Sequence, residues 1–149
     1  MPGYEIPPRK KPVDDSGYME QMTKAIFQAG FSWRVVDDKW PNFQQAFDGF
    51  DIATVAAYDD RDMDRLLRDE GIVRNGRKIA ATIENANEFL RINAEHGTFH
   101  AYLRSMDDWS YAERRKELSE RFKGLGPTGV FTFLYCVDEE VPDWEDRNK

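Results

Sequence analysis

The chain has 149 residues, 40% of them apolar and 13% aromatic, a composition that excludes a disordered protein and suits one folded domain. Its apolar runs are too short to cross a bilayer, and its single cysteine, Cys136, excludes an internal disulfide. The first residues show no apolar stretch of the kind a secretory signal needs, so with one cysteine we expect a cytoplasmic protein. A formal net charge of −7 argues against simple electrostatic binding to nucleic acid.

Apolar residues recur at helical spacing along most of the chain, and we expect residues 14–143 to form one helical domain. Residues 1–13 are proline-rich and basic, which predicts an irregular arm, and residues 144–149 predict a loose acidic tail. Residues 14–16 can cap a first helix that runs to about Ala29, where Gly30 permits a bend or a close backbone approach. Pro41 suits the first turn of a helix, so we expect the second helix to begin at Trp40.

Caps and glycines mark the later helices. Asp51 and either Asp59 or Asp60 can cap two short helices, and Asn75 or Gly76 opens the longest one. The expected helices lie at about 52–58, 60–70, 76–96, 99–103, 111–122 and 130–137. Nothing alternates with a period of two for long except the last run, so the predicted fold class is all-α.

A glycine turn, Lys123-Gly124-Leu125-Gly126-Pro127-Thr128, lies between the last two expected helices. Unpaired amides at the start of the second helix would carry partial positive charge, so a DNA phosphate could dock there without base contacts. This docking needs few basic residues and is therefore compatible with net acidity. A plain helix–helix turn is the alternative. The candidate DNA-binding residues are Lys123, Gly124, Leu125, Gly126, Thr128, Arg74 and Lys78.

The basic residues among these candidates have a simpler interpretation. Arg74 and Lys78 belong to a small basic cluster with Arg77, and clusters of this size are common on the solvated faces of helices.

The segment Phe27-Gln28-Ala29-Gly30-Phe31-Ser32-Trp33, the glycine turn, and the segment Gly71-Ile72-Val73-Arg74-Asn75 together resemble the type I 3-methyladenine DNA glycosylases. These enzymes are members of the helix-hairpin-helix glycosylase superfamily, and the resemblance runs from about residue 18 to 143. It implies an all-α fold and a DNA N-glycosylase that flips a nucleotide out of double-stranded DNA. The substrate would be an alkylated base such as 3-methyladenine, removed in base-excision repair.

The resemblance also assigns residues to a site. Trp33 matches the tryptophan that helps hold the base in the family, although a packed core residue is the alternative. The base-binding pocket would contain Trp33, Phe27, Gln28 and Tyr18. Thr128 stands where strand-cleaving members carry a lysine nucleophile, which implies a monofunctional enzyme that uses water. Asp143 lies about where the superfamily carries an aspartate, and is the candidate catalytic residue.

Two departures from the family keep a second function open. Ala25 stands where the family carries the glutamate that recognises the damaged base, and Glu20 is more than one helical turn away from it. The ligands of the family's structural zinc are also missing, since no cysteine or histidine precedes His96, so we expect no metal and no cofactor. The chain is then either a glycosylase whose carboxylate comes from elsewhere, such as Asp143 or Glu20, or an inactive module that binds DNA or a protein partner.

Overall fold

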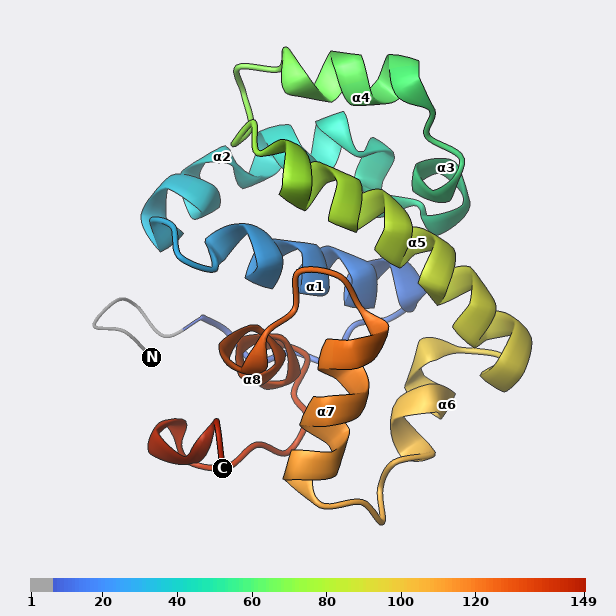
Figure 1. Ribbon diagram of the computed structural model, residues 1–149, viewed down its shortest axis with the longest axis vertical. Coiled ribbons are helices and arrows are strands. Elements are labelled where there is room, and N and C mark those ends of the chain that lie inside the picture. The colour runs from blue at the N-terminus through green and yellow to red at the C-terminus, as the bar shows by residue number, and fades with distance from the viewer. Residues whose placement is uncertain (1–6) are drawn as a thin grey trace.

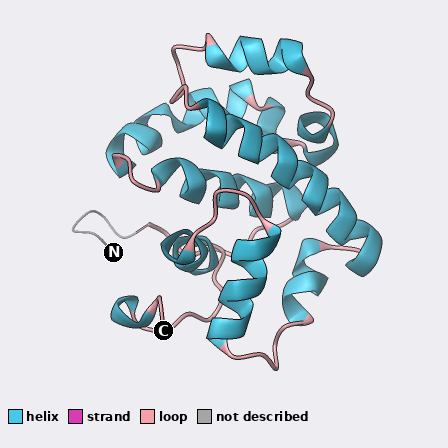
Figure 2. Cartoon of the chain, viewed as in Figure 1, coloured by secondary structure: helices cyan, strands magenta, loops and turns pink. Residues whose placement is uncertain are grey.

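The computed structural model describes residues 7–149, and every regular element in that range is helical (Figures 1 and 2). The helices are α1 (Asp15–Gln28), α2 (Trp33–Ala46), α3 (Ile52–Ala56), α4 (Asp60–Leu67), α5 (Gly76–His96), α6 (Phe99–Arg104), α7 (Tyr111–Arg121) and α8 (Pro127–Cys136), with the 3-10 turns η1 (Asp48–Phe50) and η2 (Trp144–Asp146). The all-α fold class predicted from the sequence is confirmed. None of the helices in this range has the length and apolar character needed to cross a bilayer.

Helix α1 lies at the centre of the fold, between α5 and α2 on one side and α8 on the other (Figure 1). It buries apolar side chains around most of its surface, as does α8. Aromatic rings join the helices, because Phe99 of α6 packs against Phe89 of α5 and Phe133 of α8, with ring centroids 4.6 and 6.0 Å apart. This core positions the ends of α1 and α8 beside each other.

Several predicted helix caps are present in the structure. The Asp14 carboxylate accepts from the Gly17 amide at 2.9 Å, and the Asn75 side chain accepts from the Lys78 amide at 3.1 Å. Ser110 forms a capping box with Glu113 at the start of α7. These side-chain caps fix where α1, α5 and α7 begin, and the sequence located the beginnings of these helices correctly.

The predicted start of α2 at Trp40 is wrong, because the helix begins at Trp33. The Ser32 hydroxyl accepts from the Val35 amide at 3.3 Å and caps this earlier start. Pro41 therefore lies inside the helix rather than in its first turn. Val36 and Trp40 share the buried stripe that continues beyond Pro41, and this burial outweighs the hydrogen bond that a proline cannot donate.

Both terminal segments pack against the helical body as far as the structure describes them. Residues 1–6 of the expected arm lie outside the described part. From Pro7 onward the chain follows the end of α8, where the Lys10 amide donates to the Cys136 carbonyl at 3.1 Å and Lys11 pairs with Glu139 at 3.2 Å. The C-terminal residues, expected to be a loose tail, are held by Arg115, which donates to the carbonyls of Arg147 and Lys149 at 3.1 and 2.9 Å.

Candidate active site

The turn between α1 and α2 presents Trp33 at the surface of the core. Gly30 has φ +68°, in the left-handed region that favours glycine, and it reverses the chain directly after α1. The Phe31 amide donates to the Gln28 carbonyl at 3.1 Å and closes the turn. Trp33 is then the first residue of α2 and stays half-buried.

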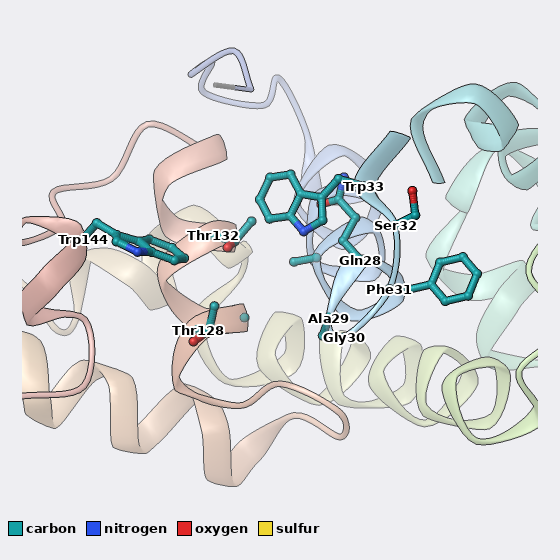
Figure 3. A pocket seen from close by; sticks show the side chains of 11 residues that line it. Gln28, Ala29, Gly30, Phe31, Ser32, Trp33, Thr128, Thr132 and Trp144 are labelled. Carbon is teal, nitrogen blue, oxygen red and sulfur yellow. The ribbon is translucent and has the colours of Figure 1, made fainter. Parts of the chain in front are cut away.

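A cavity of about 580 Å³ opens between this turn and the start of α8 (Figure 3). Trp33 stands on one side of it and Trp144 on the other, with Thr128 and Thr132 between them. The described residues that line it are Ala25, Gln28, Ala29, Gly30, Phe31, Ser32, Trp33, Thr128, Gly129, Thr132 and Trp144. None of these residues has an ionisable side chain, so the described wall of the cavity is polar in places but carries no charge.

Two polar side chains in this wall are available to a ligand. Gln28 is 5% exposed and Thr132 is 3% exposed, and neither side chain has a hydrogen-bond partner among residues 7–149. A carboxamide both donates and accepts, and a hydroxyl does the same. Their polar atoms are not among the buried side-chain atoms that lack a partner in the described residues, so they remain open to solvent. A bound molecule with hydrogen-bonding edges can take the place of that water.

Tyr18 and Phe27, which the sequence placed in the base pocket, do not line the cavity. Tyr18 is 2% exposed and packs on Phe99 with ring centroids 5.0 Å apart. Phe27 is fully buried against Phe43, at 4.8 Å. The helical period of α1 turns these two rings toward the core, whereas Gln28 and Ala25 face the cavity.

The two candidate carboxylates also lie outside this cavity. Asp143 is exposed, precedes η2 as its cap residue, and does not line the cavity. Glu20 accepts hydrogen bonds from Trp40 Nε1 and Gln44 Nε2, both at 2.8 Å, and lines a second cavity of about 340 Å³. Ala25, at the position of the family's glutamate, lines both cavities. In the described structure, neither candidate replaces the missing glutamate at the cavity wall.

The glycine turn between α7 and α8 is fixed at its base and open at its tip. The Lys123 amide donates to Asn85 Oδ1 at 2.8 Å, and Asn85 Nδ2 donates back to the Lys123 carbonyl at 3.0 Å. Gly124 has φ +76° and packs so closely on α1 that a Cβ there would lie 3.2 Å from Ile26 Cγ2. The remaining amides find no acceptor among the described residues: Gly124, Leu125, Gly126, Thr128 and Gly129.

The basic candidates divide into one that is used internally and two that remain exposed. Lys78 Nζ donates to the carbonyls of Phe27 and Ala29 at 3.2 and 2.8 Å, so it closes the end of α1 instead of projecting as a DNA contact. Burial lowers the pKa of Lys78. Arg74 and Lys123 are exposed and form no ion pair within residues 7–149.

The donor set does not fit the zinc of the family. The described residues contain no group of three or more His, Cys, Asp and Glu side chains placed to hold a metal ion. His100 lies with its Nδ1 3.4 Å from the Tyr18 hydroxyl, and burial raises the pKa of the Cys136 thiol to about 11. His100 is exposed and Cys136 is half-buried, and neither belongs to a cluster of possible metal ligands among the described residues.

Sequence reasoning missed three residues of the described cavity wall, Gly129, Thr132 and Trp144. Thr132 follows Thr128 by one helical turn, and this spacing could have placed both hydroxyls on one face of α8. Trp144 was missed because the acidic residues around it predicted a loose tail. A large aromatic side chain in that tail could have indicated that the segment packs against the helical body.

The comparisons with known proteins agree with this architecture. Residues 10–125 match the family model described as methyladenine glycosylase. DNA-3-methyladenine glycosylase 1 of Escherichia coli is 33% identical over 93 residues, which are 62% of this chain and 47% of that protein. DNA-3-methyladenine glycosylase of Haemophilus influenzae is 26% identical over 106 residues, 71% of this chain and 55% of that protein. The chain thus spans about half the length of the curated relatives it matches.

Solved structures extend the similarity over nearly the whole chain. A structure of 3-methyladenine DNA glycosylase I has a TM-score of 0.75 at 27% identity, covering 86% of this chain and 81% of the other. The Staphylococcus aureus enzyme, solved to explain its 3-methyladenine recognition, has a TM-score of 0.78 at 25% identity, covering 94% and 86%. Sequence and structure therefore agree, and the chain belongs to the methyladenine glycosylase family.

Proposed function

We propose that the protein is a monofunctional DNA N-glycosylase that excises alkylated bases such as 3-methyladenine from double-stranded DNA in base-excision repair. The observation that carries the proposal is the position of the uncharged cavity directly beside the open amides of the glycine turn. Thr128 and Gly129 belong to both features. A phosphate docked on the turn would therefore hold a strand next to a cavity that can receive an everted base.

The chemistry of an alkylated purine suits an uncharged cavity. The base is positively charged while it is attached to the sugar and leaves as a neutral molecule, so the positive charge moves to the sugar as the bond breaks. Stacking on Trp33 would hold the positively charged base by cation–π attraction, and hydrogen bonds to Gln28 and Thr132 would orient it for departure. Thr128 offers no amine, so water is the nucleophile.

Phe31 would assist nucleotide eversion. Its side chain is 46% exposed and points away from Trp33 (Figure 3). An apolar ring that enters a base step helps to unstack DNA, and Phe31 belongs to the turn that borders the cavity, with its ring turned outward (Figure 3). Phosphate contacts from the turn, which includes the exposed Lys123, would set the register without base readout.

The second candidate function is a module that binds DNA without cleaving the glycosidic bond. It is favoured by Ala25, because the described cavity wall then has no carboxylate to stabilise positive charge on the sugar. Chromatography of bases released from methylated duplex DNA separates the two functions. Release of 3-methyladenine above a heat-inactivated control is the expected result, whereas tight DNA binding without release would establish the module.

A further inference from the structure

The C-terminal segment 143–149 contributes a large aromatic side chain to the cavity. Trp144 lines it on the side opposite Trp33, and the two indoles are separated by the α8 hydroxyls (Figure 3). We propose that Trp144 is the second aromatic wall of the base site, so that a planar purine is held between two indoles and not by a charged side chain. This inference rests on the proposed function.

Trp144 is held in place by three contacts. The Phe131 ring of α8 meets the Trp144 ring edge-to-face, with centroids 5.2 Å apart and an interplanar angle of 81°. The Arg147 guanidinium lies over the Trp144 ring, 4.0 Å from its centroid. Arg147 Nη1 also donates to the Trp144 carbonyl at 2.8 Å. A side chain fixed in this way loses little freedom when a ligand arrives, which favours binding.

Arg147 connects this wall to the start of α8. Its Nε donates to the Thr128 hydroxyl at 3.2 Å, and Thr128 is both a cavity residue and part of the glycine turn. Arg115 of α7 then holds the carbonyls of Arg147 and Lys149. Arg147 is therefore a positioning residue, which acts on the ligand through Trp144.

This arrangement defines the class of ligand. Two indoles, the Gln28 carboxamide and the Thr132 hydroxyl offer aromatic contact and hydrogen bonds, and none of them requires a charged base. The expected ligand is a planar purine with hydrogen-bonding edges. Once the alkylated base is free it is neutral, so it differs from the unmodified base mainly in shape and not in charge.

The test is calorimetric titration of the protein with free 3-methyladenine. We expect Trp144→Ala to weaken binding at least ~5-fold, the lower end of the loss expected for one base–aromatic contact. Trp144→Phe keeps an aromatic ring on Phe131 and should stay within ~3-fold of the unmodified protein. Trp109→Phe is the matched control, since this indole is 40% exposed and lies outside the cavity. Circular dichroism verifies that each variant is folded.

Arg147 supplies an independent check of the positioning. Arg147→Ala should weaken binding of free 3-methyladenine, whereas Arg147→Lys, which keeps a cation near the ring, should recover part of the affinity. A folded Trp144→Ala variant with unchanged affinity would overturn the proposal, and so would an unmodified protein that binds no free 3-methyladenine.

The outcomes also separate this inference from the proposed function. If binding of the free base depends on Trp144 but no base is released from DNA, the role of Trp144 is supported and the glycosylase activity is refuted. If base is released from DNA but binding of the free base does not depend on Trp144, the glycosylase activity is supported and the role of Trp144 is refuted.

Discussion

Replacing Gly126 with aspartate should weaken DNA binding without destabilising the fold. Gly126 is the cap residue of α8, with φ −80° and ψ −177°, an extended conformation that any residue adopts. A Cβ there would meet no heavy atom within 4 Å. An aspartate can therefore fit without strain, and its carboxylate can accept from the first-turn amides. We expect the free energy of unfolding to stay the same or rise by a few tenths of a kcal/mol.

The same carboxylate acts against a docked phosphate in two ways. It occupies amides that the phosphate would use, at a cost of about 1.5 kcal/mol for one hydrogen bond to a charged group. It also repels the phosphate by about 0.6–1.2 kcal/mol, for charges ~7 Å apart with an effective dielectric constant of ~40–80. Together these effects predict about 30- to 100-fold weaker binding at low salt.

Fluorescence anisotropy with a labelled duplex measures this effect, at ~20 and ~200 mM salt. The added repulsion should shrink at the higher salt because screening shortens its range. Gly126→Ala is the control for steric contact, since it adds a side chain without charge or cap, and it should bind nearly as tightly as the unmodified protein. An aspartate variant with unchanged affinity, or an alanine variant that loses as much, would remove the turn from the DNA interface.

Three further substitutions test the turn, the cavity and the ion pairs. Gly124→Ala should lower the free energy of unfolding by about 1–2 kcal/mol in urea titration, because alanine disfavours φ +76°. Ala25→Glu should raise the ratio of 3-methyladenine to hypoxanthine released from DNA, because a carboxylate in the cavity favours a positively charged base. Burial raises the pKa of Glu88, but hydrogen bonds from Arg121 and Arg91 outweigh it and lower the pKa overall. Glu88 thus stabilises the fold above its unfolded pKa of about 4.5 and loses this effect as the pH falls, so Glu88→Gln should reduce the fall in urea stability between pH 5 and 3.

Each of these has a clear contrary result. Full stability in Gly124→Ala would mean that the turn adopts another backbone conformation. An unchanged release ratio in a folded Ala25→Glu variant would place the reacting base outside the cavity. An unchanged acid profile in Glu88→Gln would show that this carboxylate does not contribute to acid sensitivity.

Local signals in the sequence located most of the helices because caps and periodic burial act over a few residues. Asn75 and Ser110 are examples, since each accepts from an amide three residues further on. Pro41 misled the prediction because a local preference for the first turn was overridden by the buried stripe through Trp40, which depends on packing against α1.

The site was less predictable because it depends on contacts between distant segments. Trp33 lines the cavity whereas Tyr18 and Phe27 do not, because periodicity alone could not say which face of α1 meets the cavity. Lys78 donates to carbonyls that lie 49 and 51 residues away in the chain, and no local sequence pattern predicts such a contact. Trp144 reaches the cavity because contacts with α8 and α7, made by Phe131 and Arg115, hold the segment around it.

The most direct test of the account is the single-turnover rate of 3-methyladenine release with enzyme in excess over methylated duplex DNA. The account predicts that the unmodified protein releases the base and that folded Trp33→Ala does so about 10- to 100-fold more slowly, as loss of one base–aromatic stack implies. Equal rates for the two proteins would contradict the claim that the base enters the cavity beside this indole.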